Sequence, residues 1–152
     1  MRKNFLHPPA LSLLLAGTAG AVQAQAPLPF IELGVGAQRI QAEVASTPAT
    51  HVSGLMQRKA LPERQGMLFA HAESGKLCMW MKNTLIPLSV AFIDAQGRIL
   101  NIEDMQPGTR DLHCASSPAQ YALEMNIDWF RANNVGSGDT VRGLENLPGG
   151  KK

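Results

Sequence analysis

A segment in the middle of the chain restricts the fold more than any other, because its side chains alternate along two stretches joined by a short polar turn. Residues 88–93 have the two-residue period of a β-strand. Residues 94–97 end in a glycine, which suits the positive φ of a tight turn, and residues 98–102 supply a partner strand. The pattern predicts an antiparallel hairpin. One face of its first strand is expected to carry Leu88, Val90 and Phe92.

Further short segments of this kind lie on both sides of the hairpin. Strands are expected at residues 31–33, 40–45, 66–70, 77–81, 121–125 and 140–142. Residues 71–75 are predicted to form a polar turn, and residues 105–118 a loop. Many short strands at close spacing predict a mostly β chain, folded as a compact β-sandwich or a barrel-like sheet with two short helices. An α+β fold with one open sheet is the alternative.

The two expected helices are brief. Thr47 can cap the first, and Pro48 fits its first turn, so we expect a helix near residues 48–57. Gly54 lies inside this span, where a glycine costs about 1 kcal/mol relative to alanine. The second helix is expected at residues 129–133.

The N-terminus has the pattern of a secretory signal peptide. Arg2 and Lys3 precede an apolar run at residues 10–22, and small residues then allow cleavage after Ala24 or Ala26. We therefore expect a signal peptide at 1–26, a single β-rich domain at 27–147 and a disordered tail at 148–152, in a periplasmic or secreted protein. An uncleaved N-terminal anchor is the alternative, although the run is short of the roughly 20 residues that span a bilayer.

The charge balance argues against two classes of partner. Arg2 and Lys3 are the charged residues of the first 26, so the rest of the chain holds 12 basic and 12 acidic side chains. Without a basic run, nucleic-acid binding has no support. Without a basic amphipathic helix, stable membrane insertion after signal cleavage is not expected either. An unknown small molecule or an envelope protein remains as the expected partner.

Two cysteines, Cys78 and Cys114, are the only ones in the chain. In an oxidising compartment such a pair predicts a disulfide, which would stabilise a loop of about 37 residues by roughly 3 to 4 kcal/mol. Two unrelated thiols are the alternative. A thiol nucleophile at Cys114 beside His113 is conceivable, but export favours the disulfide.

Several motifs carry a family resemblance. They are Gly-Leu-Met at 54–56, Gly-Met-Leu-Phe at 66–69, Trp-Met-Lys-Asn-Thr at 80–84 with Ile-Pro-Leu at 86–88, and Tyr-Ala-Leu-Glu-Met-Asn at 121–126. In this order they resemble the domain of unknown function 192 family, over about residues 30–145. The family pattern often has Ala-Gly where this chain has Ile-Asp at 127–128. This difference affects where the last helix is expected to start. The resemblance implies a small, mostly β, often exported protein and no known reaction.

Common catalytic and metal signatures are absent from the sequence. It lacks a nucleophile elbow, a phosphate-binding loop and a dinucleotide fingerprint. His51, His71 and His113 have no zinc-like spacing, so no metal and no cofactor are expected. Met79 and Met81 face the same way on the expected strand, which leaves Cu(I) binding as an alternative to core packing.

The candidate ligand-binding residues are Trp80, Met81, Lys82, Asn83, Thr84 and Glu124. Trp80 can stack on a ligand while Lys82 and Asn83 donate hydrogen bonds, which suits the rim of a pocket. The alternative is that the segment is core and turn. Glu124 is expected on the face opposite Leu123 and needs a partner if that face is covered, with Lys82 as the candidate.

These residues predict a non-catalytic binding module, and no catalytic residue is assigned. One alternative is an envelope hydrolase that uses Glu124 with Lys82 or Asp139 in one cleft. A purely structural envelope protein, with no cleft, is the third.

Overall fold

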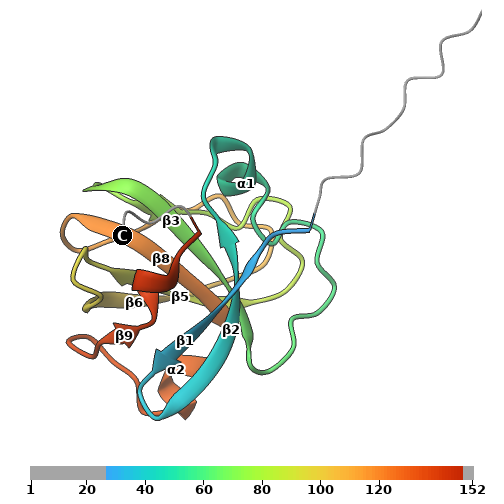
Figure 1. Cartoon of the computed structure of the whole chain (residues 1–152). Helices are drawn as coiled ribbons and strands as arrows, with labels where there is room; N and C mark the ends of the chain where they lie inside the picture. The colour runs from blue at the N-terminus through green and yellow to red at the C-terminus, as the bar shows by residue number, and fades with distance from the viewer. Residues whose placement is uncertain (1–26, 149–152) are drawn as a thin grey trace, which may run out of the picture.

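A computed structural model describes residues 27–148, in which the alternating segments become short strands (Figure 1). The strands are β1 (Phe30–Val35), β2 (Gln38–Ala45), β3 (Gln65–Gly75), β4 (Cys78–Met79), β5 (Leu88–Ile93), β6 (Ile99–Met105), β7 (His113–Cys114), β8 (Ala119–Asn126) and β9 (Val141–Arg142). The helices are α1 (Pro48–Ser53), α2 (Trp129–Ala132) and the 3-10 helix η1 (Leu144–Asn146). The predicted signal peptide and residues 149–152 of the predicted tail lie outside the described residues.

Seven strands form one curled sheet in the order β6-β5-β8-β3-β2-β1-β9, and β4 pairs with β7 separately. All neighbours in the sheet are antiparallel except β2 and β3, which are parallel because α1 and the loop after it carry the chain back across the sheet. The sheet curls into a half-barrel (Figure 1). The prediction of a mostly β fold with a barrel-like sheet and two short helices is therefore confirmed.

The two edges of the sheet are joined at one end. Val141 N–H donates to Gly97 C=O at 2.8 Å, and Ile99 N–H donates to Asp139 C=O at 2.8 Å. Gly97 has a φ of +86°, and a Cβ there would lie 2.7 Å from the carbonyl oxygen of Val141. Only glycine therefore allows the β5–β6 turn to approach β9 this closely.

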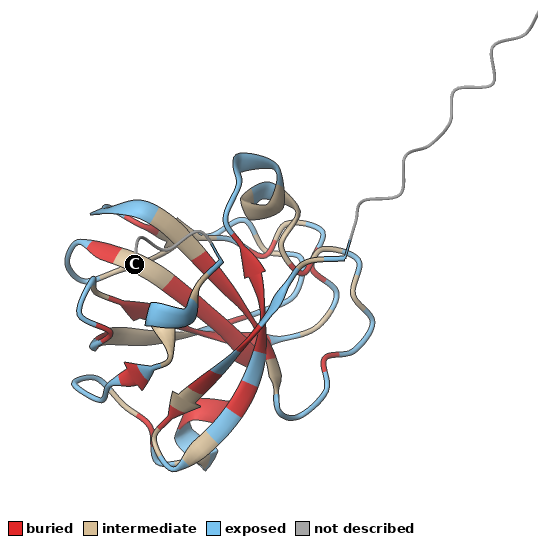
Figure 2. Ribbon diagram, in the orientation of Figure 1, coloured by how far each residue is buried: buried red, intermediate tan, exposed pale blue. Residues whose placement is uncertain are grey.

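Each face of the sheet carries its own core. The inner face packs side chains from β1, β2 and β8 against α2, including Leu33, Leu123 and Phe130. The outer face packs Leu88, Val90 and Phe92 beneath α1 and the long loops. Figure 2 shows the buried positions along the strands, with exposed positions in α1 and the peripheral turns. The predicted faces of β5 and the hairpin that it forms with β6 are confirmed.

The first predicted helix exists but is shorter than expected. Thr47 and Thr50 form a reciprocal capping box at its start, and Pro48 occupies the first turn. The helix ends at Ser53 instead of residue 57, because Gly54 takes a φ of +42°. A Cβ at Gly54 would lie 3.1 Å from the Phe69 ring, so this glycine also permits close packing on the sheet.

Two predicted boundaries are wrong near the disulfide. Residues 71–75 were expected to form a turn but continue β3. The end of β3 pairs again with β8. The backbone carbonyl of His71 also accepts a hydrogen bond from Gln120 Nε2 at 3.1 Å. The expected strand at 77–81 has only the two residues of β4, because its partner in the predicted loop, β7, is equally short. Local alternation could not reveal a pairing that depends on two distant segments.

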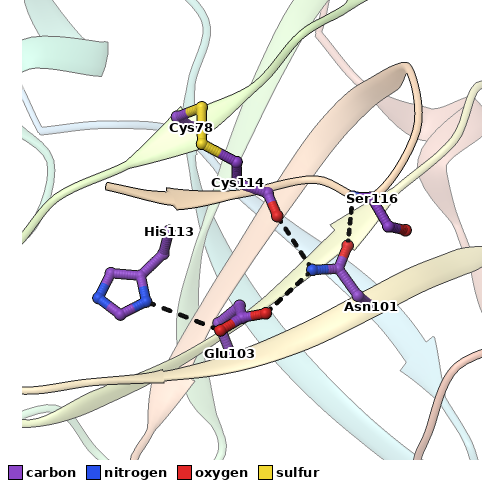
Figure 3. Close-up of a disulfide and its surroundings, with 6 residues drawn as sticks. All are labelled: Cys78, Asn101, Glu103, His113, Cys114 and Ser116. Carbon is purple, nitrogen blue, oxygen red and sulfur yellow. Dashed lines mark hydrogen bonds and ion pairs between the residues drawn. A yellow bond between two sulfur atoms is a disulfide. The ribbon is translucent and has the colours of Figure 1, made fainter. Parts of the chain in front are cut away.

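The predicted disulfide between Cys78 and Cys114 is confirmed. The two cysteines face each other across β4 and β7 (Figure 3). The Asn101 side chain on β6 donates to Cys114 C=O at 3.0 Å and accepts from Ser116 N–H at 2.9 Å. His113 also lies 3.8 Å from the Glu103 carboxylate of β6. The disulfide-bonded loop is thereby fixed to the edge of the large sheet.

Candidate functional site

Glu124 lies in the middle of the outer face of the sheet, where a carboxyl group is rare. It belongs to β8, and its neighbours on β3 and β5 are Met67 and Val90, both fully buried. Glu124 itself is only 3% exposed. The inner core takes Leu123 and Met125 from the opposite face of β8, so the predicted facing of Glu124 agrees with the structure.

Burial raises the pKa of the Glu124 carboxyl from its ordinary 4.5 to about 8. Loss of hydration is the cause, and no charge or hydrogen bond among residues 27–148 offsets it. Lys82, its predicted partner, places its ammonium 5.5 Å from the centre of the Trp80 ring. The ion pairs between described residues do not include one between Lys82 and Glu124. The carboxyl is therefore buried without a cation.

A cavity of about 20 Å³ lies beside this carboxyl. Within residues 27–148, every side-chain nitrogen or oxygen that is out of reach of solvent has a hydrogen-bond partner. Since Glu124 has none, its oxygens are open to the cavity. We call this space the Glu124 cavity. It is lined by Val52, Ser53, Gly54, Leu55, Met56, Phe69, Met79, Trp80, Thr84 and Glu124.

The rim of the Glu124 cavity is built from two loops joined through their backbones. Gln57 and Asn83 both have left-handed backbones, with φ of 62° and 58°. Gln57 N–H donates to Asn83 C=O at 2.9 Å, and the Gln57 side-chain amide reaches the same oxygen at 3.4 Å. The loop after α1 is thus attached to the turn that follows Trp80.

A third segment supports the rim from its other side. Met81 N–H donates to Thr109 C=O at 3.1 Å, and Gly108 N–H donates to Thr84 C=O at 3.0 Å. Residues 108 and 109 belong to the loop that the disulfide closes. Within the disulfide-bonded loop, the turn at 80–84 is therefore held by residues 108 and 109 as well as by the α1 side, which favours a preformed site.

The predicted site residues separate into three groups in the structure. Trp80, Thr84 and Glu124 all line the cavity, and Trp80 is still 42% exposed. Lys82 lies over the Trp80 ring, outside the lining. Met81 is fully buried in the outer core, and Asn83 is an exposed turn residue whose carbonyl holds the rim together. The residues of 80–84 thus combine cavity-lining positions with core and turn positions.

The α1 side of the cavity was not predicted. Val52, Ser53 and Met56 contribute to the lining, and Val52 is largely exposed. The available signal is Gly-Leu-Met at 54–56. The glycine of this motif lets the chain approach the Phe69 ring closely, so it serves packing on the sheet and not helix formation.

Two larger hollows elsewhere contain charges that already have partners. In one of about 600 Å³, Arg131 pairs with both Asp104 and Asp128. In another of about 790 Å³, Arg58 Nη2 lies 2.7 Å from Glu43 Oε2. The Glu124 cavity differs from these two because its carboxyl has no such partner among the described residues.

The alternative chemistries receive little support from the geometry. The Asp139 carboxylate accepts a hydrogen bond from Gly136 N–H at the joined edges, and it does not line the Glu124 cavity. Met79 lines the cavity, but Met81 is fully buried, so the two thioethers do not offer one open copper site. Residues 27–148 contain no group of three His, Cys, Asp or Glu side chains placed to hold a metal ion.

Two solved structures share this fold. A Sinorhizobium meliloti 1021 protein, provisionally described as a transcription regulator, is 29% identical with a TM-score of 0.76, covering 79% of this chain and 98% of its own. A protein of unknown function from Novosphingobium aromaticivorans DSM 12444 is 30% identical with a TM-score of 0.71, covering 83% and 99%. No curated protein matches the sequence. The DUF192 family, described as an uncharacterized ACR, matches residues 31–143, most of the chain. The chain therefore belongs to the DUF192 family.

Proposed function

We propose that this chain is an exported binding domain whose ligand enters at the Glu124 cavity. The family is described as uncharacterized, so the proposal rests on this site alone. The observation that carries it is a buried carboxyl without a partner, open to a cavity with a half-exposed tryptophan at its rim. Such a combination is typical of ligand sites, where a few polar groups lie among apolar ones.

A stability argument supports a functional role for Glu124. An apolar or amide side chain at this position would avoid the free-energy cost of keeping an ionisable group out of water. The neighbours Met67 and Val90 are apolar, which is the kind of side chain that this buried face favours. A carboxyl that lowers stability is explained if it contacts a ligand.

Export is supported by two observations that are independent of the cavity. The pattern of residues 1–26 fits a signal peptide. The Cys78–Cys114 disulfide fits an oxidising compartment such as the periplasm. Among the described residues, no helix has the length and apolar character needed to cross a bilayer. The role named for the Sinorhizobium meliloti protein is not carried over, because the charges after residue 26 are balanced.

The binding proposal is tested by measuring melting temperatures of the purified domain against a library of small metabolites. Compounds that stabilise the wild-type protein should lose most of their effect in Trp80→Ala and in Glu124→Gln. Leu112→Ala is the matched control, since Leu112 is a more exposed apolar residue outside the cavity. A compound set that acts equally on all four proteins would refute the site.

The export proposal is tested by expressing the full chain in a Gram-negative host and weighing the product by mass spectrometry. We expect a periplasmic protein that begins at Gln25 or Pro27, with no free thiol before reduction. An arginine introduced into the apolar run, Leu14→Arg, should keep the chain in the cytoplasm. A full-length wild-type chain with two free thiols would contradict the proposal.

A further inference from the structure

This inference rests on the proposed function and concerns the chemical class of the ligand. The Glu124 cavity offers about 20 Å³. A cavity can hold a water molecule once it offers roughly 10–15 Å³. The space next to the carboxyl is therefore large enough for a water-sized group.

The charge of that group follows from the surroundings of Glu124. The facing positions on β3 and β5 are apolar, and none of the ion pairs among residues 27–148 involves Glu124. Lys82 lies over an indole ring, and Arg58 pairs with Glu43. His51 on α1 places its Nε2 at 3.0 Å from a backbone carbonyl. A cationic group entering the cavity would thus meet a carboxyl that pairs with no other cation among residues 27–148.

A primary ammonium is a cation that suits both this space and the groups around it. It has about the size of a water molecule and carries three N–H donors. The hydroxyl side chains of Ser53 and Thr84 lie in the same lining as Glu124. A hard divalent metal ion prefers six or more oxygen ligands, several of them carboxylates, and Glu124 is the one carboxylate in this lining.

The walls and rim suit the alkyl chain behind an ammonium. Met56 and Met79 line the cavity with flexible thioether side chains that adapt to a methylene chain. Trp80 offers a large apolar surface at the opening. Its ring already has the Lys82 ammonium at 5.5 Å, so the same ring attracts ammonium groups within this molecule.

We propose that the Glu124 cavity binds the terminal ammonium of an unbranched alkyl chain, supplied by a free alkylamine or by a lysine side chain. The ammonium pairs with the Glu124 carboxylate, and the chain leaves the cavity past Met56, Met79 and Trp80. Because the empty site holds a protonated carboxyl near neutral pH, pairing with an ammonium releases one proton to the solvent.

The test uses n-pentylammonium chloride as the probe in isothermal titration calorimetry at pH 6.5. Repeating the titration in two buffers of different ionisation enthalpy measures proton release, which we expect to be close to one per bound amine. Glu124→Gln should weaken binding at least ten-fold. Glu73→Gln, the same change at an exposed glutamate outside the cavity, should leave it unchanged. The neutral n-pentanol should not bind.

The position of the probe is read from methyl signals of ¹³C-labelled methionine. Met56 and Met79 line the cavity, so their signals should shift on titration. Met125 packs in the inner core on the opposite face of the sheet, and its signal should stay in place. This measurement needs no substitution and therefore does not depend on how a variant folds.

A second ligand distinguishes the two sources of ammonium. If Nα-acetyl-lysine methylamide binds as tightly as n-pentylammonium, the proposal holds with a lysine of a partner as the source. If it binds much more weakly, the proposal holds with a free amine. Absence of n-pentylammonium binding, or equal binding by Glu124→Gln, overturns the inference. In that case the proposed binding function still holds if metabolites of another class stabilise the wild-type protein and lose this effect in Glu124→Gln and Trp80→Ala.

Discussion

Replacing Glu124 with glutamine should stabilise the folded protein at neutral and alkaline pH, although it removes the group that we assign to the ligand. The pKa of the carboxyl is about 8 in the folded protein, against 4.5 ordinarily. Between these values the folded protein binds more protons than the unfolded chain, so wild-type stability falls as the pH rises. Glutamine has nearly the same shape and no charge, so the variant lacks this loss.

The size of the effect follows from the two pKa values. Each pH unit between them changes the free energy of unfolding by about 1.4 kcal/mol. The wild type should therefore lose about 5 kcal/mol relative to Glu124→Gln between pH 4.5 and pH 8 or above. By pH 7 about 3 kcal/mol of that difference should be present. Glutamate and glutamine can also differ in packing, which adds a difference in unfolding free energy that does not depend on pH. The difference measured at pH 4.5 gives this constant, which is then subtracted.

Urea unfolding at a series of pH values, followed by circular dichroism with the disulfide intact, measures this difference. Other titrating groups act on both proteins and cancel. Among them is His71, whose pKa is lowered by burial and by the neighbouring His51. Parallel stability curves for the two proteins would refute the reasoning, because they would mean that the Glu124 carboxyl is already solvated or paired in the folded protein.

Two further predictions concern the framework of the fold. Replacing Cys78 and Cys114 with serine should lower the free energy of unfolding by roughly 3 to 4 kcal/mol in urea titrations, and an unchanged midpoint would contradict the stabilising role of the bridge. Gly97→Ala should cost about 1 to 3 kcal/mol, because it adds a contact with Val141 C=O to the backbone strain. Gly108→Ala is its control, since Gly108 also has a positive φ but an added Cβ meets nothing within 4 Å. Equal losses for the two glycine variants would show that the joined edges tolerate a Cβ.

Much of the fold could be predicted because the two-residue period records burial directly. The strands of the β5–β6 hairpin and their faces follow from residues 88–102 alone. The joined edges could not be predicted, since Gly97 and Val141 meet through backbone groups that leave no side-chain pattern. The early end of α1 is a related case. The conformation of Gly54 depends on the Phe69 ring beneath it, which local propensity does not include.

The candidate site was predicted in part for similar reasons. The alternation of β8 placed Glu124 on the outer face, and an aromatic residue beside polar ones marked Trp80 as a rim. The expected pair of Lys82 with Glu124 is not found among the described ion pairs. A long flexible side chain has many orientations, and its choice of the Trp80 ring is a tertiary contact. Val52 was missed because α1 has no signal that relates it to β8.

The joined edges also bear on how copies of this protein behave toward one another. A sheet with open borders exposes rows of amide and carbonyl groups, where a neighbouring molecule can add a strand and start an aggregate. Near Gly97 and Val141 those groups are already bonded within one molecule. Strand addition at that end must first break these bonds, so the fold itself should hinder fibril-like association there, even in concentrated solution.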